Sequence, residues 1–202
     1  MSQLASNTFK VLENNELFQK KIDSIQRMVF RISSIINGMR SISRSDLSQD
    51  FKLKSLKLLV TETIELAQMR FRNTEVKLLC GEIPNIEIEC KDVQTSQVLI
   101  NLLNNGYDAV CKLPDPWVQL SIALVGKSVE FTVTDSGPGI PADIADKLMK
   151  PFFTTKPVGE GTGLGLSISL NIARDHGGTF ELDRSCSNTR FVLTIPISQL
   201  KA

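Results

Sequence analysis

The apolar positions near the start of the chain repeat with the period of a helix. Between residues 22 and 42 they recur at alternating steps of three and four, with a flanking row at steps of seven: Ile22, Ile25, Val29, Ile32, Ile36 and Met39, with Met28, Ile35 and Ile42. A stripe of this width is typical of a helix packed in a bundle. The spacing favours a helical hairpin or dimer stem over the alternative, a helix lying on the core of its own domain.

Beyond this segment the pattern changes from helical to mixed. A second helix is predicted for about 54–72, after the polar break at 43–50. We then predict strands at 76–80 and 86–90, a helix at 93–113, strands at 117–124 and 128–135, a short helix near 141–149, a helix at about 164–175, and strands at 177–183 and 189–197. The boundary is placed near 72–76, between a helical stem (1–72) and an α/β unit (73–202).

Composition narrows the function classes. The chain has 202 residues, of which 42% are hydrophobic and 22% charged, so it can bury a core. A net charge of +1 gives no general attraction to nucleic acid, and no apolar run reaches the length of a membrane span. We expect a cytoplasmic protein with no nucleic-acid partner and no membrane segment. Four cysteines without zinc-site spacing are expected to be buried free thiols: Cys80, Cys90, Cys111 and Cys186.

Residues 159–169 (GEGTGLGLSIS) place four glycines within seven positions, directly before an apolar run that suits a helix. Glycine at this density indicates a backbone that approaches a partner closely or moves. Two common nucleotide motifs do not fit. The Rossmann pattern fails because these glycines are spaced by two throughout. A P-loop imitation at Gly126-Lys127 fails because Ser121 stands where the first glycine belongs.

Three polar stretches precede this loop. Asn101, Asn105 and Asp108 share one helical face, either as oxygen ligands for Mg²⁺ or as a solvated face or local cap. Asp135 ends an alternating strand in DSGPGI, where a carboxylate can accept hydrogen bonds from an exocyclic amine, although the sequence is also a good turn. PFFTTK (151–156) ends at Lys156 ahead of the loop, whose helix start favours bound phosphate.

In combination and order, these four stretches resemble the N, G1, F and G2 boxes of the ATP-binding catalytic domain of histidine kinases, part of the superfamily that includes gyrase, Hsp90 and MutL. The resemblance covers about residues 76–198. It implies an α+β fold: a two-layer sandwich in which a mixed sheet is backed by helices, with ATP under a flexible lid. Together with the helical pattern before it, the fold expected for the whole chain is this sandwich preceded by a helical dimerisation stem.

The resemblance also implies roles for individual residues. Asn105 is the expected Mg²⁺ ligand, Asn101 its companion near the phosphates, and Asp135 the partner of the adenine amine. Phe152 and Phe153 are expected to anchor the base of the lid, and Lys156 to reach a phosphate; Asn101 and Lys156 are the expected catalytic residues. The whole expected set for ATP and Mg²⁺ is Asn101, Asn105, Asp108, Asp135, Gly137, Gly139, Ile140, Phe152, Phe153, Thr154, Thr155, Lys156, Gly161, Thr162, Gly163, Leu164, Gly165 and Leu166.

Two positions depart from the usual pattern of these proteins. Gly106 stands where alanine is usual, at a modest cost to the helix. Asn101 occupies the position at which the related ATPases carry a glutamate general base. Without that carboxylate the activation of water is harder, which favours transfer to a protein acceptor over hydrolysis.

The acceptor itself is not evident. The chain has one histidine, His176, at the end of a helix before Gly177-Gly178, where a structural role is predicted. The stripe at 22–39 resembles the second helix of a dimerisation hairpin, and the residues before it hold no histidine. Either the chain is a fragment cut below the acceptor helix, or the protein has lost its acceptor. In both cases we predict Mg-ATP binding without phosphohistidine formation on this chain.

The favoured function is therefore the catalytic core of a two-component sensor kinase, a homodimer through its stem, whose phosphoryl group passes to a response regulator. Two alternatives stay open. A serine kinase of the anti-sigma type shares the ATP boxes but usually lacks a long stem. A non-catalytic dimeric scaffold or pseudokinase fits the absent acceptor but not the complete set of boxes.

Overall fold

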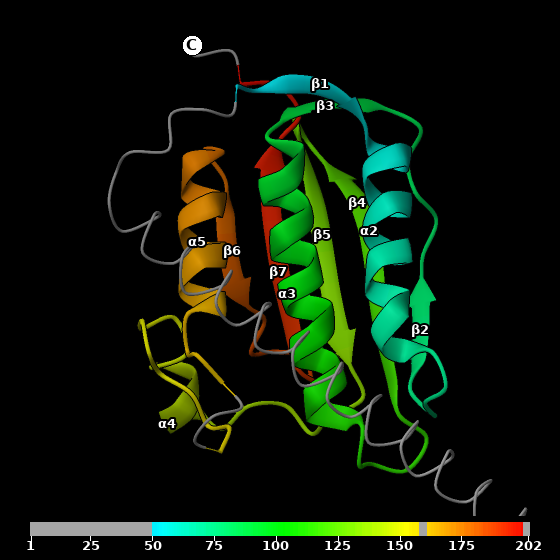
Figure 1. The fold of residues 1–202 in the computed structure, drawn as a ribbon. Coiled ribbons are helices and arrows are strands. Elements are labelled where there is room, and N and C mark those ends of the chain that lie inside the picture. The colour runs from blue at the N-terminus through cyan, green and yellow to red at the C-terminus, as the bar shows by residue number, and fades with distance from the viewer. Residues whose placement is uncertain (1–49, 158–160, 200–202) are drawn as a thin grey trace, which may run out of the picture.

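The computed structural model describes residues 50–157 and 161–199. The helix predicted for 22–42, and with it the expected dimer contact, lies outside the described residues. Figure 1 shows the described part as a sheet with helices on one side. It confirms the two-layer sandwich that the family resemblance implies.

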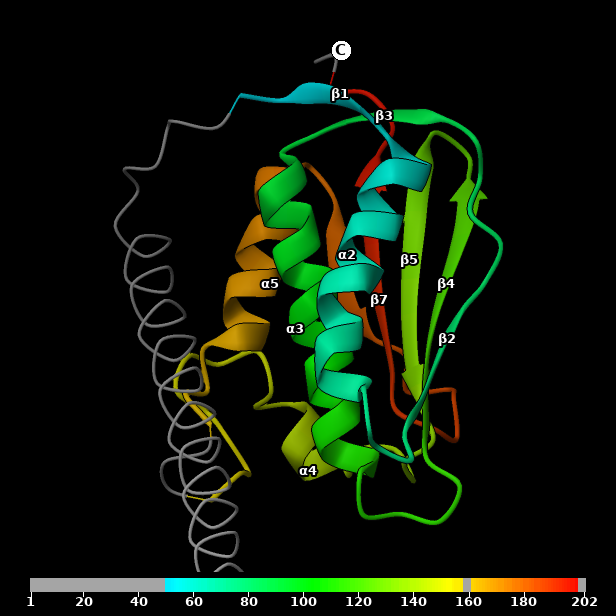
Figure 2. The same ribbon diagram turned by 45° about the vertical axis from the view of Figure 1, so that its right-hand side comes forward.

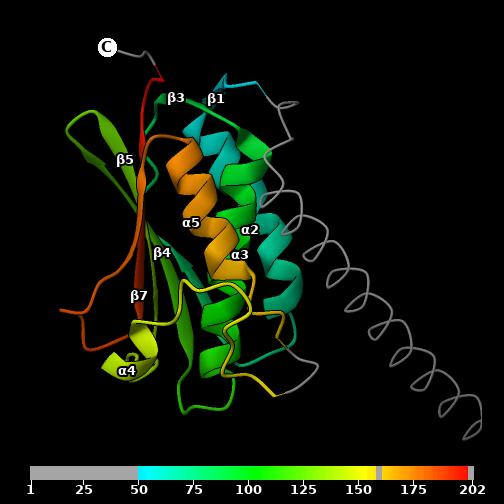
Figure 3. The same ribbon diagram turned by 90° about the vertical axis from the view of Figure 1, so that its left-hand side faces the viewer.

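The main sheet has five strands in the order β2-β4-β5-β7-β6. Strand β2 runs parallel to β4, and the other neighbouring pairs are antiparallel, so the sheet is mixed. Helices α2, α3 and α5 lie together over one face (Figure 3). The strands are β2 (Lys77–Cys80), β4 (Trp117–Val125), β5 (Ser128–Asp135), β6 (Thr179–Leu182) and β7 (Arg190–Pro196), and the helices are α2 (Leu56–Phe71), α3 (Asp92–Val110) and α5 (Gly165–Asp175).

A two-stranded ribbon lies at one end of the sandwich. Strand β1 (Lys52–Ser55) pairs antiparallel with β3 (Glu87–Cys90), and β3 leads through Lys91 directly into α3. Figure 2 shows the ribbon crossing above the helices, with β1 running into α2. The sequence pattern predicts β3 but not β1, whose last two residues fall within the helix predicted for about 54–72.

Helix α2 belongs to the sandwich. Its inner face, with Leu56, Leu59 and Val60, is buried in the same core as the inner faces of α3 and the sheet. The hydroxyl of Thr63 donates to Ser96 Oγ on α3 over 2.9 Å. The boundary predicted at 72–76 therefore falls inside one packed unit, because α2 buries its apolar face against α3 and the sheet rather than in a stem.

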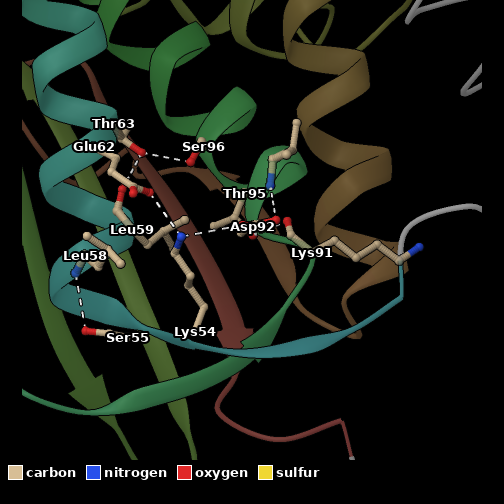
Figure 4. Close-up of polar contacts among 11 residues, drawn as sticks. Lys54, Ser55, Leu58, Leu59, Glu62, Thr63, Lys91, Asp92, Thr95 and Ser96 are labelled. Carbon is tan, nitrogen blue, oxygen red and sulfur yellow. Dashed lines mark hydrogen bonds and ion pairs between the residues drawn. The ribbon is translucent and has the colours of Figure 1, made fainter.

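Polar contacts fasten the ribbon to both helices (Figure 4). Lys54 on β1 lies 3.1 Å from Glu62 Oε2 on α2 and 3.7 Å from Asp92 Oδ2 at the start of α3. The Ser55 hydroxyl accepts a hydrogen bond from the Leu58 N–H, which caps α2. The chain thus enters the sandwich through a strand held by the two helices it meets.

His176 is buried at the end of α5 and has a structural environment, as predicted. Its Nδ1–H donates to the Ile172 carbonyl over 2.8 Å, and its Nε2 accepts from the Lys91 N–H over 3.1 Å. The Phe51 ring lies edge-on to it at 5.2 Å between centroids. His176 therefore joins the end of α5 to the junction of β3 and α3.

Two smaller predictions need correction. Among the cysteines, which are all free, only Cys90 is buried; Cys80 and Cys111 are exposed and Cys186 is half-buried. Burial raises the pKa of the Cys90 thiol to about 11. The short helix predicted near 141–149 extends only over α4 (Ala142–Ala145), and turns follow it.

Candidate functional site

Helix α3 carries a row of polar residues, Asn101, Asn105 and Asp108, that contacts α5 and Lys156. Its apolar residues Val98, Leu99, Leu102 and Leu103 are buried, which fixes the rotation of the helix. Asn101 Nδ2 donates to Ser169 Oγ on α5 over 3.1 Å. Asn105 Oδ1 accepts from Lys156 Nζ over 3.3 Å, and Asp108 Oδ2 lies 2.5 Å from the same ammonium. The structure thus brings the predicted residues Asn101, Asn105, Asp108 and Lys156 together.

Asp135 ends β5 as a buried carboxylate, with 4% of its surface exposed. Its Oδ1 accepts from the Gly137 N–H over 2.8 Å, and its own N–H donates to the Thr189 carbonyl over 3.0 Å. Burial raises the pKa of Asp135, while hydrogen bonds from the Gly137 N–H and the Thr189 hydroxyl act in the opposite direction. A carboxyl group with this fixed orientation is suited to recognise a single donor group.

A pocket of about 360 Å³ is lined in part by residues that follow Asp135 in the sequence. Its walls come from the predicted residues Gly139 and Ile140, from α4, and from the β6–β7 connection, including Thr189. The polar row of α3 does not line this pocket. Of the predicted residues after β5, Gly139 and Ile140 therefore border the pocket, whereas Gly137 and the predicted residues on α3 do not.

The segment 152–156 meets α3 through Lys156. The Lys156 N–H donates to Thr154 Oγ1 over 3.1 Å, and Thr155 is exposed. Phe153 is half-buried, whereas Phe152 is 69% exposed and has a φ of +66°. In this structure Phe152 does not anchor the loop by burial, and Phe153 is the better placed of the two phenylalanines.

The glycine-rich segment packs closely against these groups. Gly163 has a φ of +66°, and a Cβ there would overlap the Phe152 carbonyl group. A Cβ on Gly165, the first residue of α5, would overlap the Asn101 side chain. A side chain at Gly163 would push the loop off the Phe152 backbone, so this glycine is required by a contact within the protein, whereas a side chain at Gly165 would displace the Asn101 amide.

The other predicted residues of the glycine-rich segment also pack against their neighbours in the protein. A Cβ on Gly161 would lie 2.5 Å from Thr154 Oγ1. The Leu164 N–H donates to Thr162 Oγ1 over 3.3 Å; the Leu164 side chain is buried and that of Leu166 is half-buried. Residues 158–160 lie outside the described part of the chain, and the segments on either side of them meet at the start of α5.

Two neighbours of the site were missed from the sequence. Thr189 holds Asp135 through its backbone carbonyl and its hydroxyl, and Arg70 forms an ion pair with Asp108. Thr189 follows three small or polar residues at the start of a strand, and Arg70 lies on the helix assigned to the stem. Neither belongs to a motif, so only the three-dimensional contacts identify them.

The oxygen atoms of the polar row suit a Mg²⁺ ion that is also bound by phosphate, rather than one held by the protein alone. Within the described residues there is no group of three or more histidine, cysteine or carboxylate side chains that would hold a metal ion. Amide oxygens such as Asn105 Oδ1 suit Mg²⁺, which keeps several waters and usually binds through few protein ligands plus substrate phosphates. The start of α5 beside Asn101 is suited to an anion, because the first N–H groups of a helix have no partner within the helix itself.

The chain has a mixed sheet covered by a helical layer, a buried carboxylate at a strand end, and a glycine-rich helix start. Together these features place it in the class of sandwich domains that bind a nucleotide. Residues 90–199, a little more than half of the chain, match the family described as histidine kinase-, DNA gyrase B-, and HSP90-like ATPase. The chain belongs to this family.

Two similar proteins carry the names of sensors. Sensor histidine kinase ZraS of Escherichia coli (strain K12) is 32% identical over 91% of this chain, and C4-dicarboxylate transport sensor protein DctB of Rhizobium meliloti (strain 1021) is 31% identical over 87%. The chain spans 37% of ZraS and 28% of DctB. It is therefore similar to one part of these longer proteins.

Solved structures give the same result. The nucleotide-free catalytic domain of histidine kinase ThkA matches with a TM-score of 0.65 and 30% identity, over 74% of this chain and 97% of that domain. ThkA in complex with response regulator protein TrrA matches with a TM-score of 0.72 and 26% identity, over 92% of this chain and 53% of that chain. Over the residues that the structure describes, no helix is both long and apolar enough to cross a membrane.

Proposed function

We propose that this chain binds Mg-ATP and catalyses phosphoryl transfer to a histidine, as the catalytic part of a sensor histidine kinase. Family membership and the similarity to ZraS, DctB and ThkA support this proposal. The single observation that carries it is the buried Asp135 carboxylate at the end of β5, oriented by Gly137 and Thr189.

Each group has a physical task in this mechanism. Asp135 accepts a hydrogen bond from the adenine amine, and Asn105 holds Mg²⁺, whose charge offsets that of the phosphates. Lys156 and the N–H groups at the start of α5 hold phosphate oxygens. Asn101 lacks the carboxylate that would deprotonate water, so the site favours transfer over hydrolysis. Most of the rate enhancement then comes from positioning and charge neutralisation.

The acceptor lies on another chain or on another segment of the natural protein. The chain's only histidine is His176, whose side chain is buried and bonded at both ring nitrogens. A response regulator is the proposed final acceptor, by analogy with the ThkA complex with TrrA. We also propose a cytoplasmic location and a homodimer formed through the helical pattern predicted at 22–42.

Replacement of Asp135 by asparagine tests the nucleotide site. An amide has one acceptor oxygen, so either the adenine amine or the Gly137 N–H loses its partner, and Mg-ATP affinity falls by about tenfold or more. Calorimetric titration measures the loss, and a thermal melt checks folding. Asp115→Asn is the matched control, because Asp115 is exposed, pairs with the exposed Lys77, and has a φ of +48° that asparagine tolerates.

A second measurement separates the kinase from its alternatives. The chain is incubated with labelled ATP and a histidine-bearing hairpin from a related kinase. Acid-labile label on the hairpin supports a histidine kinase core, and acid-stable phosphoserine supports a serine kinase. Nucleotide binding without transfer to any acceptor supports a scaffold. Unchanged affinity in Asp135→Asn, or no affinity in the unaltered chain, refutes the proposed site.

A further inference from the structure

The carboxylate of Asp108 is shared by two cations from different parts of the fold. Its Oδ2 lies 2.5 Å from Lys156 Nζ, and its Oδ1 pairs with the Arg70 guanidinium. Arg70 belongs to the last turn of α2, whereas Lys156 lies outside regular secondary structure, just before the glycine-rich segment. One anion thus links a helix of the core to the loop of the nucleotide site.

Arg70 is held independently of Lys156. Its guanidinium lies over the Tyr107 ring, 4.8 Å from the centroid, and Tyr107 in turn lies edge-on to the buried Phe71 at 5.1 Å. Stacking on an aromatic face restricts the guanidinium to one orientation. Arg70 therefore stays next to Asp108 when Lys156 moves.

Lys156 has reason to move when ligand binds. Its ammonium lies 3.3 Å from Asn105 Oδ1, the oxygen proposed for Mg²⁺. Two cations do not share one amide oxygen at that distance without strong repulsion. Lys156 must therefore leave Asn105, and contact with a phosphate also takes it from Asp108. Without another partner, the half-buried Asp108 would then remain unpaired beside a polyanion, at a cost in affinity.

We propose that Arg70 is a positioning residue for nucleotide binding: it is the retained counter-ion of Asp108, which allows Lys156 to leave for the phosphates. This inference rests on the proposed function. Arg70, Asp108 and Lys156 together carry one net positive charge beside Asn105. Loss of Arg70 leaves Asp108 and Lys156 as a neutral pair in which Asp108 holds Lys156 more firmly. The net positive charge beside Asn105 is then lost, and Lys156 is less readily released to the phosphates.

A double-mutant cycle tests this role. Arg70→Gln is expected to weaken Mg-ATP binding about twofold to fivefold, the range for a partly exposed charge. AMP, which lacks the terminal phosphates, binds with unchanged affinity. Lys156→Gln also weakens ATP binding, but by a smaller factor when Arg70 is already replaced, because Lys156 is then less available. The Mg-ATP affinity of Arg70→Lys should be closer to that of the unaltered chain than the affinity of Arg70→Gln is.

Lys77→Gln is the matched control, because Lys77 forms an exposed ion pair with Asp115 and is expected to leave ATP affinity unchanged. Equal ATP affinity in Arg70→Gln and the unaltered chain overturns the inference, as does strict additivity of the two substitutions. An equal loss for AMP and ATP assigns Arg70 a merely structural role and also overturns it. If the unaltered chain binds no ATP, the proposed function fails first, and that result is distinct from the others.

Discussion

At the scale of single residues, His176 is the side chain whose burial has the clearest measurable effect. Burial lowers the pKa of His176 from its ordinary value of 6.5, the nearby Lys91 acts in the same direction, and Asp175 and the bond to Ile172 act in the opposite one. The neutral ring fits its surroundings, because Nε2 must stay unprotonated to accept the Lys91 N–H. A protonated ring would lose that bond and place a charge inside the protein.

This environment predicts how stability depends on pH. Below about pH 6.5 the unfolded chain takes up a proton at His176 that the folded chain does not, so the free energy of unfolding falls as pH falls through this range. Urea unfolding between about pH 7.5 and about pH 6 measures the effect. Since the chain has no other histidine, His176→Gln should have a flatter profile. The same slope in both proteins would contradict this explanation.

At the residue scale, motifs singled out Asn105, Asp108 and Lys156, and the structure places these three side chains in contact. The ligand roles predicted for them stay predictions, and residues held by long-range contacts did not stand out in the sequence. Arg70 and Thr189 did not stand out, because their partners Asp108 and Asp135 are far away in the chain. The exposure of Phe152 also depends on the packing of a loop, which no periodicity reports.

At the scale of elements, periodicity predicted most helices and strands because each buries one face. It placed α2 correctly as a helix but in the wrong unit, since an apolar face does not say which surface covers it. Strand β1 was missed because its four residues, Lys52–Ser55, depend on pairing with β3 rather than on an alternating pattern of their own.

Substitutions on α2 test its place in the sandwich. Leu59→Ala removes a buried side chain from the shared core and should lower the free energy of unfolding by about 2–5 kcal/mol. Leu66→Ala on the same helix is the control, because Leu66 is 58% exposed and its loss should change stability by less than about 0.5 kcal/mol. Urea denaturation of the whole chain provides both values. Equal effects would mean that α2 is not part of this core.

At the scale of the whole molecule, the buried histidine predicts the outcome of incubation with ATP alone. With Mg-ATP and no added acceptor, the chain should gain no acid-labile, base-stable phosphate, because His176 is enclosed and engaged at both nitrogens. Filter assays after acid and alkaline treatment measure this. Acid-labile label on the chain alone would show that His176 becomes accessible, and His176→Gln would identify it as the site.

The two-stranded ribbon of β1 and β3 limits how this unit can be joined to a different upstream module. Leu53 faces Glu89 and Lys54 faces Ile88 in the register of β1 and β3. Since side chains alternate along a strand, one inserted or deleted residue between 51 and 55 would turn Lys54 away from Glu62 and Asp92. Chimaeras should therefore be spliced before residue 50, where the length of the junction is free of this parity constraint.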